Sequence, residues 1–203
     1  MKIKAKIIGN QIWSAENLTR RQYIKLTGLA LPIENGIGWE MPDEDELTPR
    51  CCTYSLAQDK KEYYLFDQHA VLCLNNATKS LHWRVPTMHD WNQLFDHIHA
   101  HSGEGLRIDT ICNGLRGNYG WKVNGTNQFG FNAFPNPHRC EDGSYSHGGA
   151  QWWTISDFDY IGLGLYQDLN VIAESGSDHT SAMPIRLVLD LPEIRLHRDI
   201  LYI

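Results

Sequence analysis

The sequence has no long hydrophobic run and no cluster of basic residues. Its apolar stretches fall well short of the roughly 20 residues of a membrane-spanning helix. Its opening residues, MKIKAKIIGNQIW, have too short an apolar core for a secretory signal peptide. The 18 basic residues are scattered along a chain of net charge −6, so no basic surface for nucleic acid is expected. We therefore expect no membrane span, no nucleic-acid partner and synthesis in the cytoplasm.

Paired cysteines and metal-binding motifs are also missing. An odd number of cysteines without a CxxC pair excludes complete disulfide pairing within the chain and the spacing of a zinc knuckle. Ten histidines are present, but His97, His99 and His101 have no further ligand at zinc spacing. We expect free thiols, no metal site and no cofactor. The five cysteines are Cys51, Cys52, Cys73, Cys112 and Cys140.

Aromatic residues, by contrast, are numerous, with seven Trp, nine Tyr and six Phe in 203 residues. The composition, 42% hydrophobic and 21% charged, is that of a globular chain. No repeat or low-complexity linker marks a domain boundary. We expect one domain with most of its aromatic side chains in the core.

One segment has a clear helical pattern. Apolar residues recur at helical spacing over 87–101, Thr87 is a good N-cap, and Gly103 follows as a stop. A weaker pattern over 15–29 predicts a short helix interrupted at Thr27 and Gly28. The rest reads as short strands rich in β-branched and aromatic residues. These strands are KIKAKIIG, EYYLFD, QWWTIS, YIGLGLYQ, LNVIAE and PIRLVLDL.

Residues 103–149 form a long stretch rich in Gly, Asn, Ser and His. A loop of that length in a compact domain is either functional or held to the body by its own side chains. The tail, residues 191–203, alternates enough to form an added strand or a partner-binding arm. The aromatic residues available to pin the long loop are Trp121, Phe129, Phe131 and Phe134.

Four short blocks occur in order along almost the whole chain. They are IGNQIWSAENL at 8–18, WRVPTMHDWNQL at 83–94, QFGFNAFPNPHR at 128–139 with a tandem Trp after it, and PIRLVLD at 184–190. Together these blocks resemble the Fibrobacter succinogenes major paralogous domain, a C-type-lectin-like module of Bacteroidetes and their phages. WRVPT alone also occurs in relatives of formylglycine-generating enzymes, so the specificity comes from the ordered set.

The resemblance implies an α+β fold: a single C-type-lectin-like domain over residues 1–190, followed by an extension over 191–203. Short antiparallel strands, one or two helices and a long loop-rich insertion are expected. In such a module the first and last strands pair, which would join KIKAKIIG to PIRLVLDL. The Gly-Phe pair, the tandem Trp and Arg186 are then interpreted as structural. Because neighbouring residues of a strand face opposite sides, one of Trp152 and Trp153 is expected in the core and the other at the surface.

Departures from the family pattern lie in the C-terminal part. Met183 and Pro184 stand where the family has Gly-Phe, and Pro137-His138 replaces the Gly before Arg139. The chain also continues beyond Asp190. These changes bear on the register of the terminal strand and leave the expected fold intact.

The calcium-dependent sugar site of C-type lectins is incomplete in this chain. By resemblance, that site uses a triplet such as EPN or QPD and then a WND triplet. Here Phe134-Pro135-Asn136 lacks the acidic or amide first member, and WWTISD lacks WND. We expect no calcium site; the nearest acidic candidates are Asp157, Asp159 and Asp168.

An enzymatic function has little support in the sequence. Formylglycine-generating enzymes and iron-dependent sulfoxide synthases share the implied fold, but they depend on a late cysteine pair or a histidine triad. No cysteine follows Cys140, and GxSxG, HExxH and phosphate-loop motifs are missing. We expect no catalytic residue.

By resemblance, the variable ligand face lies between the tandem Trp and the last strand, at 154–181. Its Tyr, Asn, Asp and Ser residues supply aromatic contact and adaptable hydrogen bonds. The alternative is that these residues are ordinary solvent-facing strands and turns. The predicted ligand-binding residues are Trp153, Asp157, Phe158, Asp159, Tyr160, Tyr166, Gln167, Asp168, Asn170, Ser177, Asp178 and His179.

Three functions remain open from the sequence. The first is a non-catalytic binding or adhesion module for a bacterial surface glycan or protein, carried on a virion (tail, fibre or capsid decoration) or on a cell surface. The second is a structural assembly protein whose arm at 191–203 docks on neighbouring subunits in a homo-oligomer or larger assembly. The third is an oxidative enzyme of the formylglycine type. The missing signal peptide favours a virion protein, because virions assemble in the host cytoplasm.

Overall fold

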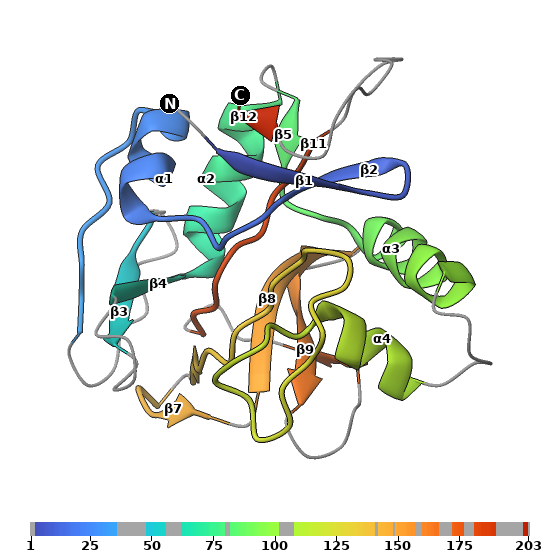
Figure 1. Cartoon of the computed structure of the whole chain (residues 1–203). Coiled ribbons are helices and arrows are strands. Elements are labelled where there is room, and N and C mark those ends of the chain that lie inside the picture. The colour runs from blue at the N-terminus through green and yellow to red at the C-terminus, as the bar shows by residue number, and fades with distance from the viewer. Residues whose placement is uncertain are drawn as a thin grey trace.

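A computed structural model describes residues 3–35, 48–55, 62–79, 82–101, 108–140, 142–147, 149–156, 160–166, 172–176, 181–189 and 201–202. Helices and short antiparallel strands are mixed along this part of the chain, which confirms the α+β class (Figure 1). None of the described helices is both long and apolar enough to cross a bilayer.

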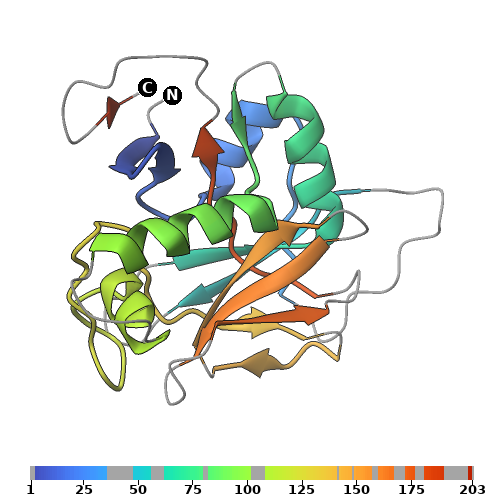
Figure 2. The ribbon, with the colours of Figure 1, turned by 90° about the vertical axis from the view of Figure 1, so that its right-hand side faces the viewer.

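The largest sheet brings together strands from both ends of the chain. Its order is β12-β1-β2-β11-β5, and every neighbouring pair is antiparallel. Figures 1 and 2 both show the two termini close together beside this sheet. The strands are β1 (Lys4–Ile8), β2 (Gln11–Ser14), β5 (Trp83–Arg84), β11 (Val188–Leu189) and β12 (Leu201–Tyr202).

The expected direct pairing of the first and last family strands is wrong. β1 and β11 belong to one sheet, but β2 lies between them and pairs with both. The reason is the tight turn at Gly9 and Asn10, which folds β2 back on β1 with Ile8 opposite Gln11. All four residues of β2 are buried, as suits a central strand, whereas β1 is partly exposed.

Three smaller groups of strands complete the sheet structure. A three-stranded sheet has the order β10-β9-β8, with β8 at Gly149–Ile155, β9 at Tyr160–Tyr166 and β10 at Ile172–Gly176. Two hairpins are separate from it. They are β3 (Cys51–Ser55) with β4 (Glu62–Phe66), and β6 (His138–Arg139) with β7 (Tyr145–Ser146).

The predicted helix over 87–101 is confirmed as α3 (Met88–His101). Thr87 Oγ1 accepts a hydrogen bond from Asp90 N, and Asp90 Oδ2 accepts one from Thr87 N, so the helix start is capped in both directions. Figures 1 and 2 show α3 between the β1–β2 hairpin and the β8–β9–β10 sheet. Its buried apolar residues are Trp91, Leu94 and Ile98, with Phe95 partly buried.

The weaker helical pattern becomes α1 (Arg20–Thr27). Thr19 caps its start, and Gly28 ends it with a φ of 72°. Two further helices, α2 (Gln68–Thr78) and α4 (Ile108–Leu115), were not predicted from the sequence. α2 begins where the buried Asp67 side chain accepts a hydrogen bond from Ala70 N.

Two large hydrophobic clusters and one small one form the core of the described residues, and neighbouring residues of β8 belong to the two large ones. Trp153 is 0% exposed and belongs to the cluster around α1 and α2, whereas Trp152 is 1% exposed and belongs to the cluster around α3 and α4. The two side chains therefore face opposite sides of β8, as predicted. The expectation that one of them lies at the surface is wrong, because both sides of β8 are covered.

The long stretch after α4 is pinned by its own aromatic residues, as expected. Trp121 and Phe131 are buried in the α3–α4 cluster, and Phe129 packs against it. The Trp121 Nε1 donates to Ala133 O at 2.8 Å. This anchoring fixes the loop over the body of the domain and positions part of a pocket.

Candidate functional site

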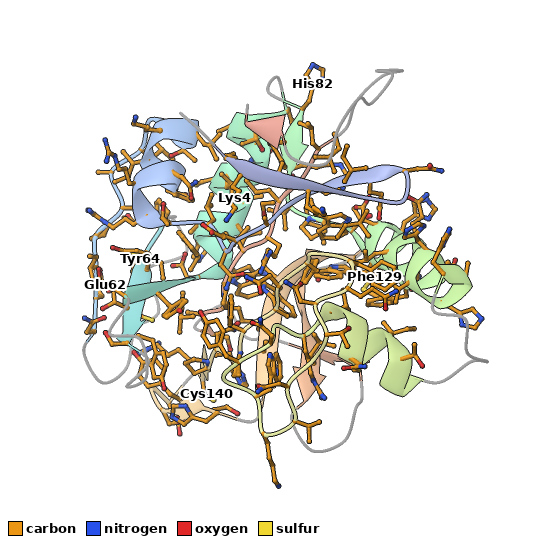
Figure 3. All side chains as sticks on the ribbon, viewed as in Figure 1. Lys4, Glu62, Tyr64, His82, Phe129 and Cys140 are labelled. Carbon is orange, nitrogen blue, oxygen red and sulfur yellow. The ribbon has the colours of Figure 1, made fainter. Side chains whose placement is uncertain are left out.

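A pocket of about 340 Å³ lies where three segments distant in sequence meet. Its walls come from the turn that precedes α1, from β4, and from the pinned loop that follows α4; Arg186 lies at its base. Figure 3 shows Glu62 and Tyr64 close together on β4. The volume falls within the range of small-molecule binding sites. We call this site the aromatic pocket.

The floor of the aromatic pocket is a buried guanidinium. Arg186 is 1% exposed and lies over the Phe131 ring, 4.5 Å from its centroid. Its Nη1 donates to Ser14 O at 2.8 Å and to Phe131 O at 3.0 Å, and its Nη2 donates to Asn132 O at 3.2 Å. Burial lowers the pKa of Arg186 to about 9, partly offset by the nearby Glu16 charge, so the group remains cationic at neutral pH.

Asn17 joins the floor to the core. Its Oδ1 accepts from Arg186 Nε at 2.7 Å and from Trp152 Nε1 at 2.9 Å. Arg186 Nε and Trp152 Nε1 can only donate hydrogen bonds, so the amide atom that faces them is Oδ1. The Nδ2 group of Asn17 is therefore on the side of the amide away from these two donors. The buried Trp152 ring thus sets the orientation of a side chain in the pocket.

One wall is aromatic. The Tyr119 and Phe134 rings lie 4.5 Å apart, centroid to centroid, with an interplanar angle of 43°. Tyr119 is 41% exposed, so part of its ring is open to solvent. Tyr63 and Tyr64 of β4 also belong to the pocket lining. Aromatic faces of this kind bind the apolar face of a ligand.

The rim carries two exposed carboxylates. Glu16 Oε1 accepts from Lys4 Nζ at 3.2 Å. Glu62 Oε2 accepts from the Tyr64 hydroxyl at 2.6 Å, and this bond is the main reason why the pKa of Tyr64 is raised. The rim is therefore rich in acceptors, whereas the floor is rich in donors.

Trp153 is the predicted ligand-binding residue whose side chain the structure describes. Trp153 Nε1 donates to Phe66 O at 2.6 Å within the core, so Trp153 is a core residue and not a ligand contact. Tyr160 and Tyr166 are the end residues of β9, whose backbone alone is described at these positions. The others, Asp157, Phe158, Asp159, Gln167, Asp168, Asn170, Ser177, Asp178 and His179, lie outside the described residues.

Possible metal-ligating side chains are scattered in the described part of the chain. No group of three or more His, Cys, Asp or Glu residues there could hold a metal ion. The His97 and His101 rings lie 4.1 Å apart on α3, and Cys140 Sγ is 3.5 Å from His138 Nε2 on the β6–β7 hairpin. Each of these is a pair without a third ligand.

The Phe134-Pro135-Asn136 triplet has a structural role. Asn136 is buried, its Nδ2 donates to Gln151 O at 3.2 Å, and its backbone N donates to Gly149 O at 3.0 Å. Asn136 thus ties the pinned loop to β8, and Phe134 faces the aromatic pocket.

Sequence reasoning missed the aromatic pocket although it had singled out most of the segments that build it. Asn17 comes from the AENL part of the first block, Phe134 from the third and Arg186 from the fourth. Arg186 was interpreted as structural, and its four hydrogen bonds support that role. The available signal was a single Arg inside the otherwise apolar segment PIRLVL at 184–189.

Comparison with known proteins places the chain in a family. The family model described as Fibrobacter succinogenes major domain matches residues 7–188. No curated protein and no solved structure matches the chain. The match extends from β1 to β11 and so contains the turn before α1, β4, the pinned loop and Arg186. The chain belongs to the Fibrobacter succinogenes major domain family.

Proposed function

We propose that this chain is a non-catalytic binding module that recognises a bacterial surface glycan in the aromatic pocket. The observation that carries the proposal is the composition of that pocket: aromatic rings on its walls, amide and guanidinium donors at its floor, and carboxylates at its rim. A sugar ring has an apolar C–H face and a periphery of hydroxyl groups, so it needs an aromatic surface together with both donors and acceptors.

The pocket lining favours binding over catalysis. The described lining residues include neither His nor Cys, so these residues form no nucleophile with an adjacent imidazole base. The two carboxylates, Glu16 and Glu62, are both exposed, in contrast to the desolvated acid that glycoside hydrolysis uses.

The fold proposed for the module is C-type-lectin-like. Support comes from the sheet that unites β1 and β11 near the two ends of the domain, and from the long loop that its aromatic side chains hold against the core. We further propose that the module acts on a virion or a cell surface, the settings in which a glycan-binding domain meets bacterial polysaccharides.

Binding to a glycan array tests the proposal. Wild-type protein is expected to bind a defined set of bacterial glycans, and Tyr119→Ala and Phe134→Ala are each expected to weaken binding at least about tenfold. Val123→Ala is the matched control, since Val123 is a 65% exposed residue of the same loop that does not line the pocket. Full binding by both pocket variants, with unfolding temperatures like the wild type, would exclude the aromatic pocket as the site.

A second candidate function, assembly through the C-terminal arm, has one observation in its favour. β12 lies within the predicted arm and pairs with the outer edge of β1, Lys4 opposite Tyr202 and Ala5 opposite Leu201. A strand that adds to an edge in its own chain has the geometry to add to the same edge of a neighbour.

A further inference from the structure

The floor of the aromatic pocket presents hydrogen-bond donors that nothing in the described chain accepts. A guanidinium has five N–H groups. Four bonds are formed by Arg186, to Asn17 Oδ1, Ser14 O, Phe131 O and Asn132 O. One Nη2 hydrogen is left over. Asn17 adds its Nδ2 group. The Oδ1 atom of Asn17 accepts from both core donors, and Nδ2, at the other end of the amide, donates to none of the described residues.

Each of the described backbone carbonyls at this floor already accepts a bond from Arg186. The carbonyl oxygens of Ser14, Phe131 and Asn132 already receive Arg186. A hydroxyl group placed at the floor would accept a bond, but its own hydrogen would have to share a carbonyl that Arg186 already occupies or reach a carboxylate at the rim. A carbonyl oxygen accepts two bonds and carries no hydrogen, so it suits the floor better.

The charge of the lining argues against an anionic ligand. Arg186 contributes one positive charge, and Glu16 and Glu62 contribute two negative charges, so the titratable lining is net negative. Glu16 lies close enough to Arg186 to raise its pKa. A ligand carboxylate at the floor would compete with Glu16 for the same cation and be repelled by it. The deep acceptor is therefore expected to be uncharged.

We infer that the aromatic pocket binds an uncharged sugar that carries an acetamido group. The acetamido carbonyl oxygen accepts from Asn17 Nδ2 and Arg186 Nη2, and its methyl group lies against Leu18, a buried residue of the lining. The sugar ring packs on Tyr119 and Phe134, and ring hydroxyls donate to Glu16 and Glu62. The inference rests on the proposed glycan-binding function and names the class of sugar.

Ligand titrations followed by NMR distinguish this inference from the broader proposal. The probes are N-acetylglucosamine and N-acetylgalactosamine, their parents glucose and galactose, and the acidic sugar glucuronic acid. At least one acetamido sugar is expected to bind about tenfold or more tighter than its parent, as for one added hydrogen-bonded group. Equal or tighter binding of the parent hexose or of glucuronic acid would overturn the inference.

The substitution Asn17→Asp tests the floor directly. It keeps an oxygen for Trp152 Nε1 and Arg186 Nε and replaces the Nδ2 donors by a second, anionic oxygen. The acetamido sugar is expected to lose about tenfold in affinity, while the affinity for the parent hexose changes little. Asn113→Asp, the same change at an exposed position of α4 outside the pocket, is the control and is expected to bind as the wild type does.

The two levels of the proposal fail in different ways. If Tyr119→Ala abolishes binding of a glycan that carries no acetamido group, and no acetamido sugar binds the wild type more tightly than its parent, the aromatic pocket binds sugars and the inference about their class is wrong. If the wild type binds no sugar of any class, both fail. Because selectivity is measured on the wild type, an Asn17→Asp chain that does not fold leaves the first test decisive.

Discussion

At the scale of single residues, Gly9 is a point where a turn and a helix constrain each other. Its φ of +62° is a conformation that side-chain-bearing residues rarely adopt. A Cβ at this position would lie 2.8 Å from both Cγ and Nδ1 of His97. The hairpin that inserts β2 into the sheet therefore depends on glycine for two independent reasons.

Gly9→Ala is expected to lower the free energy of unfolding by more than Gly28→Ala does. Gly28 also has a positive φ, +72°, but no atom lies within 4 Å of a Cβ built there. Gly28→Ala should therefore cost only the conformational term, about 1–2 kcal/mol. Urea unfolding of both variants measures the difference, which reports the contact with His97. Equal losses would show that the His97 ring moves aside freely.

The two tryptophans of β8 give a second matched pair. Trp152→Phe and Trp153→Phe each remove a buried indole N–H and some volume, and each is expected to cost roughly 1–3 kcal/mol. Only Trp152 Nε1 holds Asn17, whereas Trp153 Nε1 holds Phe66 O. Trp152→Phe is therefore expected to weaken sugar binding as well as to lower stability, whereas Trp153→Phe is expected to lower stability alone. Titration of both folded variants checks this, and equal affinities would contradict the positioning role of Trp152.

At the scale of elements, local pattern and sequence separation explain what could be predicted. α3 was predicted because its apolar spacing and its cap are both local signals. The segment that became α2, QHAVLCLNNAT, begins at a cap whose Asp67 also accepts from the backbone N of Arg50, 17 residues away in the chain. Within residues 184–189, the described part of the predicted PIRLVLDL, only β11 (Val188–Leu189) forms a strand, because the residues before it bond to the turn after β2 and to β8.

The candidate site could be predicted only in its components. Asn17 and Arg186 are 169 residues apart, and nothing in the spacing of the two segments indicates that their side chains meet. The contact depends on the order of the large sheet, in which β2 and β11 are neighbours. The third partner, Trp152, was recognised as a strand residue, but the direction of its indole N–H depends on its packing in the α3–α4 cluster.

Two histidines on different elements make stability depend on pH. Burial lowers the pKa of His97 on α3, with a smaller contribution from the His101 charge, and burial lowers the pKa of His138 on β6. A folded-state pKa below the unfolded value of 6.5 means that the unfolded chain binds these protons more readily. Their contribution to stability is therefore present above pH 6.5 and is lost as the pH falls through the lower folded-state pKa values.

Replacing both histidines should flatten this dependence. Between about pH 7.5 and about pH 5.5, the unfolding temperature of the variant His97→Gln/His138→Gln is expected to fall by less than that of the wild type. Asp67 titrates in the same window with the opposite sign, because burial raises its pKa to about 6, so the comparison is made between variants. His89→Gln, at an exposed position of α3, is the control. A loss as large as that of the wild type would assign the acid sensitivity to other groups.

At the scale of the whole molecule, the two ends of the chain meet in one sheet, and the pocket is lined in part by residues that follow β2 and precede β11 in that sheet. β12 covers the outer edge of β1, and β1 leads through β2 to the centre of the sheet. Arg186, the last residue in sequence to line the aromatic pocket, precedes β11. Assembly through the sheet edge and ligand binding in the pocket therefore use different residues, although the Lys4–Glu16 bond links the β1 edge to the pocket rim.

Removal of residues 191–203 tests that separation. The truncated chain keeps every pocket residue but leaves the β1 edge unpaired, and an unpaired strand edge is a template for association between chains. We expect the truncated protein to bind sugar as the full chain does and to associate more strongly in size-exclusion chromatography with light scattering. The opposite result, an oligomer of the full chain that dissociates on truncation, would favour the arm as an assembly device that reaches a neighbouring subunit. Loss of sugar binding by a truncated protein that remains folded would show that the two sites are coupled through the sheet.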